Sequence, residues 1–230
     1  MSDDLGPLGE FCGAVRLFPL PNLVLFPCVV QPLHVFEPRY RQLLTDALAD
    51  DRLMAMALLR PGWEKDYHKQ PPLHPVVCVG KIFKEERLSD GRYNLLLHGL
   101  CRARILEEVP AGKLYRCARV DLLEETAIAS SGAERQLRRR LGEKMSTWFA
   151  AQPAAQEQLR KLLQSDLALG TLCDIFGFAL PLEVEVKQQL LEQLDVEARV
   201  QSLLGFLETT NPLQSPKLTD RKFPPEFSSN

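Results

Sequence analysis

The sequence has few of the features that mark exported, membrane-inserted or nucleic-acid-binding proteins. Its 230 residues carry 28 Lys+Arg against 30 Asp+Glu, so it lacks the basic excess that nucleic-acid binding favours. It begins with an acidic Met-Ser-Asp-Asp, whereas a secretory signal begins with basic residues followed by an apolar run. No apolar run is long enough to cross a bilayer. We therefore expect a cytoplasmic protein with no membrane contact, for which nucleic acid is a disfavoured partner.

The sequence also has no CxxC pair, and without an export signal no disulfide framework is expected. The four histidines have no spacing typical of a metal site, so we expect no metal and no other cofactor. Most of the six cysteines lie inside apolar runs, where a reduced cysteine packs as a small apolar side chain. Cys28, Cys78 and Cys101 are therefore interpreted as core residues and not as nucleophiles.

The front half consists of short apolar segments separated by turn residues, which predicts strands over residues 15–18, 24–30, 54–59, 76–83, 95–105 and 115–123. Pro19, Pro21 and Pro27 cannot donate to a sheet ladder, so the first two segments are expected to be edge or bulged strands. The Asp90-Gly91 step predicts a hairpin turn. With one embedded helix, this pattern predicts a partly closed, mostly antiparallel β-barrel.

The embedded helix is predicted from Pro38 to about residue 48. Pro38 suits a first helical position, and Glu37 before it lies favourably at the positive end of the helix. Glu37 and Arg41 are four apart and are expected to pair weakly. The apolar positions recur at i, i+3, i+4, i+7 and i+8, the stripe of an amphipathic helix, and are Tyr40, Leu43, Leu44, Ala47 and Leu48.

From about residue 126 the apolar period changes to that of helices. We expect one helix with its stripe from Leu137 to Trp148, a second over 154–164, and a third around 166–176 capped by Ser165 or Asp166. A fourth is opened by Pro181, and a fifth is capped by Asp195. The run Arg135, Arg138, Arg139 and Arg140 is interpreted as a solvated helix face.

These patterns predict an α+β protein in three parts. The divisions are a β-barrel subdomain over 1–125, a helical bundle over 126–210, and an extended or disordered tail over 211–230 that holds four prolines.

Several ordered motifs in this sequence resemble one known family. They are Leu17-Phe-Pro-Leu-Pro-Asn-Leu-Val-Leu-Phe-Pro27, Leu33-His-Val-Phe-Glu-Pro-Arg-Tyr40, and the segments 72–80, 87–99 and 187–192. They resemble the N-terminal substrate-recognition domain of the ATP-dependent protease La (Lon), over residues 14 to 208 or so. The resemblance extends to the front domain of cereblon, whose additional zinc domain needs CxxC pairs that this sequence lacks.

The resemblance implies a PUA-like β-barrel followed by a helical subdomain, and the binding of unfolded or damaged polypeptides. It also implies a standalone version of the domain, because the two Gly-Lys pairs, Gly80-Lys81 and Gly112-Lys113, lack the other residues of an ATPase P-loop. We therefore expect a non-catalytic adaptor or regulator in protein quality control, with a protease or chaperone as a further partner. An RNA-binding PUA-like module and a small-molecule sensor remain alternatives.

Two groups of residues are candidates for a role in the site. Trp63 and Tyr67, in the polar loop 60–75, either pack back onto the barrel or provide apolar contacts for a polypeptide. Binding by added strand pairing at an exposed barrel edge stays equally open. The residues of the family motifs are expected to serve the structure of the strand–helix corner and the turns; they are His34, Phe36, Glu37, Arg39, Tyr40, Gly80, Gly91 and Gly99.

Overall fold

A computed structural model describes residues 11–66, 69–150 and 153–209 of the chain. The chain divides into two compact units, with one unit ending at Leu123 and the next beginning at Glu124. The first unit contains the strands and one α-helix, and the second contains five α-helices within the described residues. The mixed α+β class predicted from the sequence is confirmed. The predicted tail, 211–230, lies outside the described residues.

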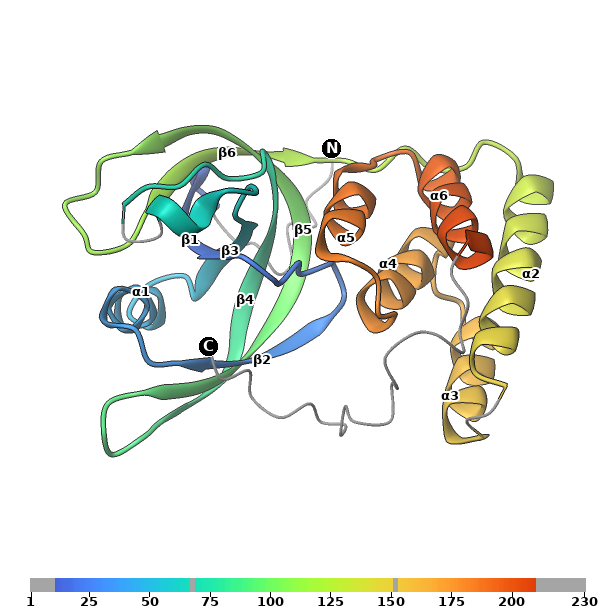
Figure 1. Ribbon diagram of the computed structural model, residues 1–230, viewed down its shortest axis with the longest axis horizontal. Helices are drawn as coiled ribbons and strands as arrows, with labels where there is room; N and C mark the ends of the chain where they lie inside the picture. The colour runs from blue at the N-terminus through green and yellow to red at the C-terminus, as the bar shows by residue number, and fades with distance from the viewer. Residues whose placement is uncertain (1–10, 67–68, 151–152, 210–230) are drawn as a thin grey trace. The chain divides into compact units, whose positions relative to one another are not determined.

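The first unit is a six-stranded sheet with one α-helix and one short 3-10 helix (Figure 1). The strands pair in the order β2-β5-β4-β3-β1-β6, and β6 also pairs with β5, so that five of the strands form a closed cycle. The β1–β3 pairing is parallel and the others are antiparallel. The elements are β1 (Ala14–Leu20), β2 (Val30–Val35), α1 (Pro38–Leu48), β3 (Leu53–Leu58), η1 (Trp63–Asp66), β4 (Val76–Arg87), β5 (Tyr93–Val109) and β6 (Cys117–Leu123).

Bulges allow the two longest strands to take part in several pairings. The β4–β5 register shifts between Val79 and Gly80 and between Ile82 and Lys84, and the β5–β6 register shifts between Ile105 and Glu107. Each bulge bends and twists its strand locally. As a result, β5 pairs with β2 and β4 near its start and with β6 near its end.

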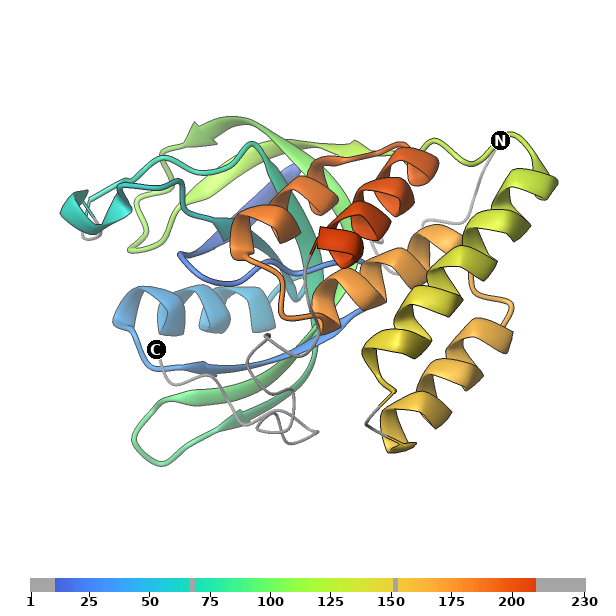
Figure 2. The ribbon, with the colours of Figure 1, turned by 45° about the vertical axis from the view of Figure 1, so that its right-hand side comes forward.

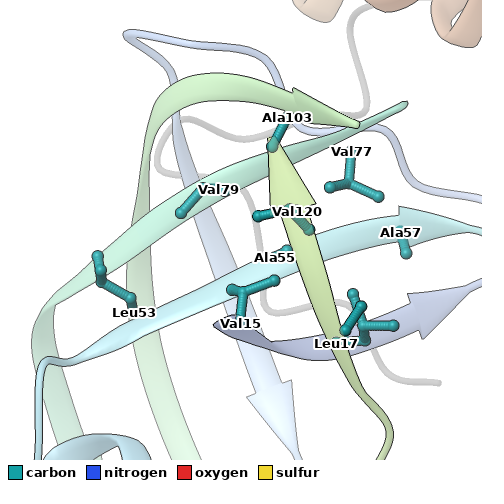
Figure 3. Close-up of a cluster of buried hydrophobic side chains, with 10 residues drawn as sticks. Val15, Leu17, Leu53, Ala55, Ala57, Val77, Val79, Ala103 and Val120 are labelled. Atoms are coloured by element: carbon teal, nitrogen blue, oxygen red, sulfur yellow. The ribbon is translucent and has the colours of Figure 1, made fainter. Parts of the chain in front are cut away.

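Small apolar side chains fill the interior of the sheet unit (Figure 3). Alanine and valine dominate this cluster, because side chains from several strands converge on a narrow space and larger residues would not fit. All six residues of β3 are buried, which explains the continuous apolar run at this place in the sequence. The buried cluster is Val15, Leu17, Leu53, Ala55, Ala57, Val77, Val79, Ala103, Ala118 and Val120.

The prediction of a strand over 24–30 is wrong for most of that segment. Residues 24–29 are not in a strand, and β2 begins only at Val30. Pro27 lacks an N–H and Cys28 has φ +61°, so a regular ladder cannot continue through them. Pro19 does lie within β1, but β6 pairs with that strand only from Ala14 to Arg16. On that side Pro19 therefore lies beyond the ladder, where its missing N–H costs nothing.

Instead of forming a strand, the segment 24–29 crosses β5 at Gly99. The Cys28 N–H donates to the Gly99 carbonyl and the Gly99 N–H donates to the Val29 carbonyl, both at 2.8 Å. A Cβ at position 99 would lie 2.1 Å from the carbonyl oxygen of Phe26. Only glycine leaves room for two backbones at this separation.

We predict that Gly99→Ala lowers the free energy of unfolding of the sheet unit by about 3 kcal/mol, at the upper end of the cost of overpacking. The clashing atom belongs to the backbone and cannot move aside as a side chain can. Urea denaturation of the wild type and the variant measures the change. The control is Gly205→Ala, where the added methyl meets open space and the better helix propensity of alanine should stabilise the second unit. Unchanged stability in Gly99→Ala would show that the crossing has space to relax.

The second unit contains α2 (Ser131–Trp148), α3 (Pro153–Gln164), α4 (Leu169–Ala179), α5 (Val184–Glu192) and α6 (Val196–Thr209) (Figures 1 and 2). Contacts join α6 to α2, α4 and α5, and also α2 to α3 and α4 to α5. The predicted cap at Asp195 is confirmed, since its Oδ1 accepts from the Ala198 N–H at 2.9 Å.

Three details differ from the sequence predictions. α4 begins three residues after Asp166 and has Ala168 at its N-cap, with no side-chain cap. Pro181 does not open α5. It follows directly on Leu180, the extended C-cap residue of α4, and α5 begins at Val184. Arg138 is half-buried instead of solvated, and its guanidinium donates to the carbonyls of residues 163, 165 and 167 before α4.

A fully buried arginine links four segments of the second unit. Arg199 of α6 is 0% exposed, and its Nη2 lies 2.7 Å from Glu125 Oε1. Its Nη1 donates to the Gln193 carbonyl at 2.8 Å, and its Nε lies 3.3 Å from Asp174 Oδ1 on α4. A Cβ at Gly170 would be 2.9 Å from both Arg199 Nη2 and Glu125 Oε2, so this glycine makes room for the pair.

We predict that Arg199→Met destabilises the second unit by about 3–5 kcal/mol, because Asp174, which is 2% exposed, then loses its buried cation. Adding Asp174→Asn should recover part of this loss, since the remaining group is neutral. Denaturant unfolding of both single variants and the double variant gives a double-mutant cycle. If the losses in free energy of unfolding of the two single variants add up to that of the double variant, Arg199 and Asp174 do not interact appreciably.

Candidate functional site

The candidate site is a cleft of about 390 Å³ in the sheet unit, here called the β5–β6 groove. Its walls come from the start of α1, from Lys69 and Gln70 in the loop 60–75, and from the β5–β6 connection, residues 108–117. Figures 1 and 2 place η1, the β5–β6 connection and α1 at one end of the sheet unit. Segments far apart in sequence therefore build this groove.

One wall of the groove is fixed to α1 by side chains one helical turn apart. Gln42 Oε1 accepts from the Leu114 N–H at 2.8 Å. Asp46 Oδ2 accepts from the Tyr115 hydroxyl at 2.7 Å and lies 3.0 Å from Lys113 Nζ. Residues i and i+4 share a helix face, so both acceptors point toward the same connection.

Arg116 fixes a further part of the same connection. Its guanidinium makes two bonds to the Glu108 carboxylate, at 2.6 and 2.5 Å. It also donates to the Pro71 carbonyl at 2.8 Å, which ties the β5–β6 connection to the loop 60–75. A two-point arginine–carboxylate pair of this kind has a defined geometry as well as strength. The β5–β6 connection is therefore tied to α1 through Leu114 and Tyr115 and to the loop 60–75 through Arg116.

The groove lining is more polar than apolar, and its apolar part includes Tyr40 and Leu114. Tyr40 lines it, stacks on Phe18 with 4.0 Å between ring centroids, and donates through its hydroxyl to the Pro19 carbonyl at 2.6 Å. Leu114 is 64% exposed at the rim. Such an exposed leucine, held by its own backbone hydrogen bond, is suited to contact an apolar side chain of a partner.

The Asp46–Tyr115 contact also determines the protonation of both groups. The pKa of the Asp46 carboxyl is lowered from its ordinary 3.8, first by the Tyr115 hydrogen bond and then by Lys113. The pKa of the Tyr115 phenol is raised to about 12, first by burial and then by Asp46. At neutral pH Asp46 is therefore ionised and Tyr115 is protonated, so the phenol can donate its hydrogen bond to the carboxylate.

We predict that Tyr115→Phe lowers the free energy of unfolding by about 1 kcal/mol at pH 7 by removing this hydrogen bond. Because the pKa of Asp46 is lower in the folded state, the bond stabilises the protein above pH 3.8, and its contribution is lost as the pH falls through the folded-state pKa. The difference between wild type and variant in urea titrations should therefore shrink from pH 7 to pH 3. In Asp46→Asn this pH dependence should be absent. An equal difference at both pH values would contradict the assignment.

Of the two residues predicted to contact a polypeptide, Trp63 lies in η1, is half-buried and does not line the groove. Tyr67 lies outside the described residues. The loop 60–75 contributes Lys69 and Gln70 instead. The β5–β6 connection was missed by the sequence reasoning, although Leu114, next to the charged Lys113, was a signal for an exposed apolar contact.

The residues of the family motifs lie at the strand–helix corner and at close backbone approaches. His34 Nδ1 lies 2.8 Å from Asn94 Oδ1, Phe36 is 38% exposed, and Arg39 pairs with Glu37 at 3.0 Å and lies over the Tyr40 ring. The Glu37–Arg41 pair predicted from spacing is not formed, since Arg41 lies against Gly91 instead. Among the three glycines, Gly80 and Gly99 face each other in the β4–β5 ladder, and Gly91 has φ +80° in the hairpin turn.

The cysteines are poor candidates for chemistry. Burial raises the pKa of the Cys101 thiol to about 11, and burial also raises that of Cys117. Cys78 is buried and Cys101 is half-buried, but Cys28 is exposed in the turn before β2, so its assignment to the core was wrong. In the part of the chain that the structure describes, no three His, Cys, Asp or Glu side chains gather in a way that could hold a metal ion. None of the helices in that part is long and apolar enough to span a membrane.

Comparison with known proteins gives a consistent result. The family model of the ATP-dependent protease La (LON) substrate-binding domain matches residues 14–209. Lon protease 2 of Myxococcus xanthus is 28% identical over 191 residues, which cover 83% of this chain and 23% of that protein. The Lon protease of Syntrophus aciditrophicus is 28% identical over 211 residues, which cover 86% of this chain and 26% of that protein. The chain thus spans about a quarter of the length of these curated relatives.

Solved structures agree on the fold. The N-terminal domain of a Mycobacterium avium complex Lon protease has a TM-score of 0.68 at 19% identity, covering 86% of this chain and 100% of that one. A Lon N-terminal domain protein from Xanthomonas campestris has a TM-score of 0.61 at 22% identity, covering 84% of this chain and 98% of that one.

Proposed function

Because this chain belongs to the family of ATP-dependent protease La (LON) substrate-binding domains, we propose that it binds unfolded or damaged polypeptides. The family match over residues 14–209, which includes both units, carries this proposal. In the proposed picture the cyclic pairing of five strands is a PUA-like barrel, and the contacts of α6 with α2, α4 and α5 organise a helical bundle.

The β5–β6 groove is the proposed contact surface for the polypeptide. Leu114 offers apolar area at its rim, and the largely buried Tyr40 contributes a small part of the lining. A recognition surface for many sequences needs apolar contacts that do not depend on one side-chain shape. The hydrogen bonds from Gln42, Asp46 and Arg116 hold the surrounding backbone, so binding requires little ordering of the groove itself.

The proposed role is recognition without chemistry, as an adaptor or regulator of protein quality control in the cytoplasm. The relatives match this chain over only 23% and 26% of their own lengths. A protease or chaperone that receives the bound polypeptide is the proposed further partner.

To test the proposal, a small protein would be prepared in its native form and as a permanently unfolded variant, each carrying a fluorophore. Binding of both to the full chain would be measured by fluorescence anisotropy. We expect binding of the unfolded form and little binding of the native form. Equal binding of the two, or binding of neither, would contradict the proposal. A structured RNA measured at low and high salt serves as a further sample, and binding that weakens steeply with salt would favour the RNA-binding alternative.

We predict that Leu114→Ser weakens binding of the unfolded protein by about fivefold to tenfold, because the variant loses the apolar contact of one leucine side chain. The matched control is Phe83→Ser, which removes an apolar side chain that is 55% exposed but does not line the groove. Thermal midpoints of both variants would confirm that they remain folded. A similar loss in both variants, or no loss in Leu114→Ser, would place the binding surface elsewhere.

A further inference from the structure

A second cleft lies between α1 and the β4–β5 hairpin and is here called the hairpin cleft. Its volume is about 350 Å³, and none of the described side chains that line it is acidic. Arg41, Gln42 and Thr45 of α1 contribute to one side, and Arg87, Gly91 and Tyr93 contribute to the other. Two arginines therefore face a space that provides no carboxylate of its own.

Arg41 is held in this cleft by the hairpin turn. A Cβ at Gly91 would lie 2.3 Å from Arg41 Nη2, so the guanidinium rests against the glycine backbone. Gly91 also has φ +80°, a conformation that other residues rarely adopt. Within the described residues, Arg41 forms no ion pair. Among the described residues its charge therefore lies against the hairpin turn without a carboxylate to neutralise it.

Arg87 supplies a second charge from the end of β4. Its guanidinium carbon lies 6.0 Å from the centroid of the Tyr93 ring, which is buried in the sheet. In the described part of the chain Arg87 likewise has no acidic partner. Nearby carboxylates are engaged elsewhere, since Glu37 pairs with Arg39 at 3.0 Å and Asp90 pairs with Arg92 at 2.5 Å.

Gln42 connects this cleft to the β5–β6 groove. Its Oε1 accepts from the Leu114 backbone, which orients the amide and leaves its NH₂ group as a donor. A planar guanidinium offers parallel N–H donors that match the two oxygens of a carboxylate. The hairpin cleft therefore has two unneutralised guanidiniums and an amide donor, which together suit one or two carboxylates.

We propose that the hairpin cleft binds carboxylate groups of the same polypeptides that the β5–β6 groove contacts. This inference rests on the proposed function. It adds that the protein prefers polypeptides in which an apolar segment lies near acidic residues or a free C-terminus. Side-chain and chain-terminal carboxylates share the chemistry, and the peptides below distinguish them.

The test uses fluorophore-labelled, unstructured peptides that share one apolar segment. One peptide carries two glutamates and a free C-terminus, the second has glutamine at both positions, and each is also made with an amidated C-terminus. Dissociation constants would be measured by anisotropy at low and high salt. We expect binding of the glutamate peptide about tenfold tighter than that of its glutamine counterpart, as charge-assisted hydrogen bonds would give, and a smaller difference at high salt. If amidation alone removes the preference, the bound group is the chain end.

Arg41→Gln and Arg87→Gln, made separately, should each reduce the preference for the acidic peptide by about threefold and leave the affinity for the neutral peptide unchanged. Arg140→Gln is the matched control, because it removes one positive charge from an exposed arginine of α2 in the second unit. Thermal midpoints of the variants would show whether they are folded, and Arg87 is exposed, so its substitution should leave the fold intact.

The outcomes separate the two proposals. Equal binding of acidic and neutral peptides would overturn the carboxylate site while leaving polypeptide binding in place. A preference that survives both Arg41→Gln and Arg87→Gln, or that falls equally in Arg140→Gln, would also overturn it, since the charge would then act from elsewhere. Binding of neither peptide would contradict the proposed function itself.

Discussion

The close crossing of the segment 24–29 over β5 at Gly99 is the constraint on which the geometry of the sheet unit depends. Two backbones meet there with no room for a Cβ, and reciprocal hydrogen bonds at 2.8 Å fix their relative position. After the crossing the chain runs along β5 as strand β2, which pairs with it from Val30 to Val35. Since α1 begins three residues after β2 ends, the position of the helix follows from the position of the crossing.

α1 in turn organises both clefts of this unit. Gln42 and Asp46 hold the β5–β6 connection through backbone and side-chain hydrogen bonds, while Arg41 lies against the turn at Gly91. The buried face of the helix, which includes Tyr40, Leu43, Leu44 and Ala47, fixes its rotation. Because that rotation is fixed, the polar positions between the apolar ones point in defined directions. One amphipathic helix thus provides both the core contact and the walls of two surface sites.

The elements that were predicted from the sequence are those determined by local chemistry. The stripe from Tyr40 to Leu48, the Asp90-Gly91 turn and the cap at Asp195 each depend on residues within about ten positions of one another. Failures occurred where distant segments decide the outcome. Residues 24–29 have strand-like composition, but the backbone of β5 lies across them at Gly99.

The influence of distant segments also explains why neither the β5–β6 groove nor the buried Arg199 was predicted from the sequence. Nothing near Leu114 in the sequence shows that Gln42, 72 residues away, holds its backbone. Likewise, Arg199 resembles a solvated helix residue until Asp174 and Glu125 are brought beside it by the packing of the helices. Burial of an arginine is favourable only with such partners, and partners at long range have no local signature in one sequence.

The two clefts against one helix suggest how weak contacts can add up to selective recognition. A rim leucine and a pair of arginines each contribute little affinity alone. An 11-residue helix is roughly 16 Å long, a span that about five residues of an extended peptide can cover. A peptide bound at one cleft would therefore reach the other as an intramolecular step, with the gain that linked binding provides. A folded protein rarely presents an apolar side chain and a carboxylate on one flexible strand, whereas an unfolded chain does so often. Selectivity for unfolded polypeptides would then arise from the spacing of the two sites, without high affinity at either one.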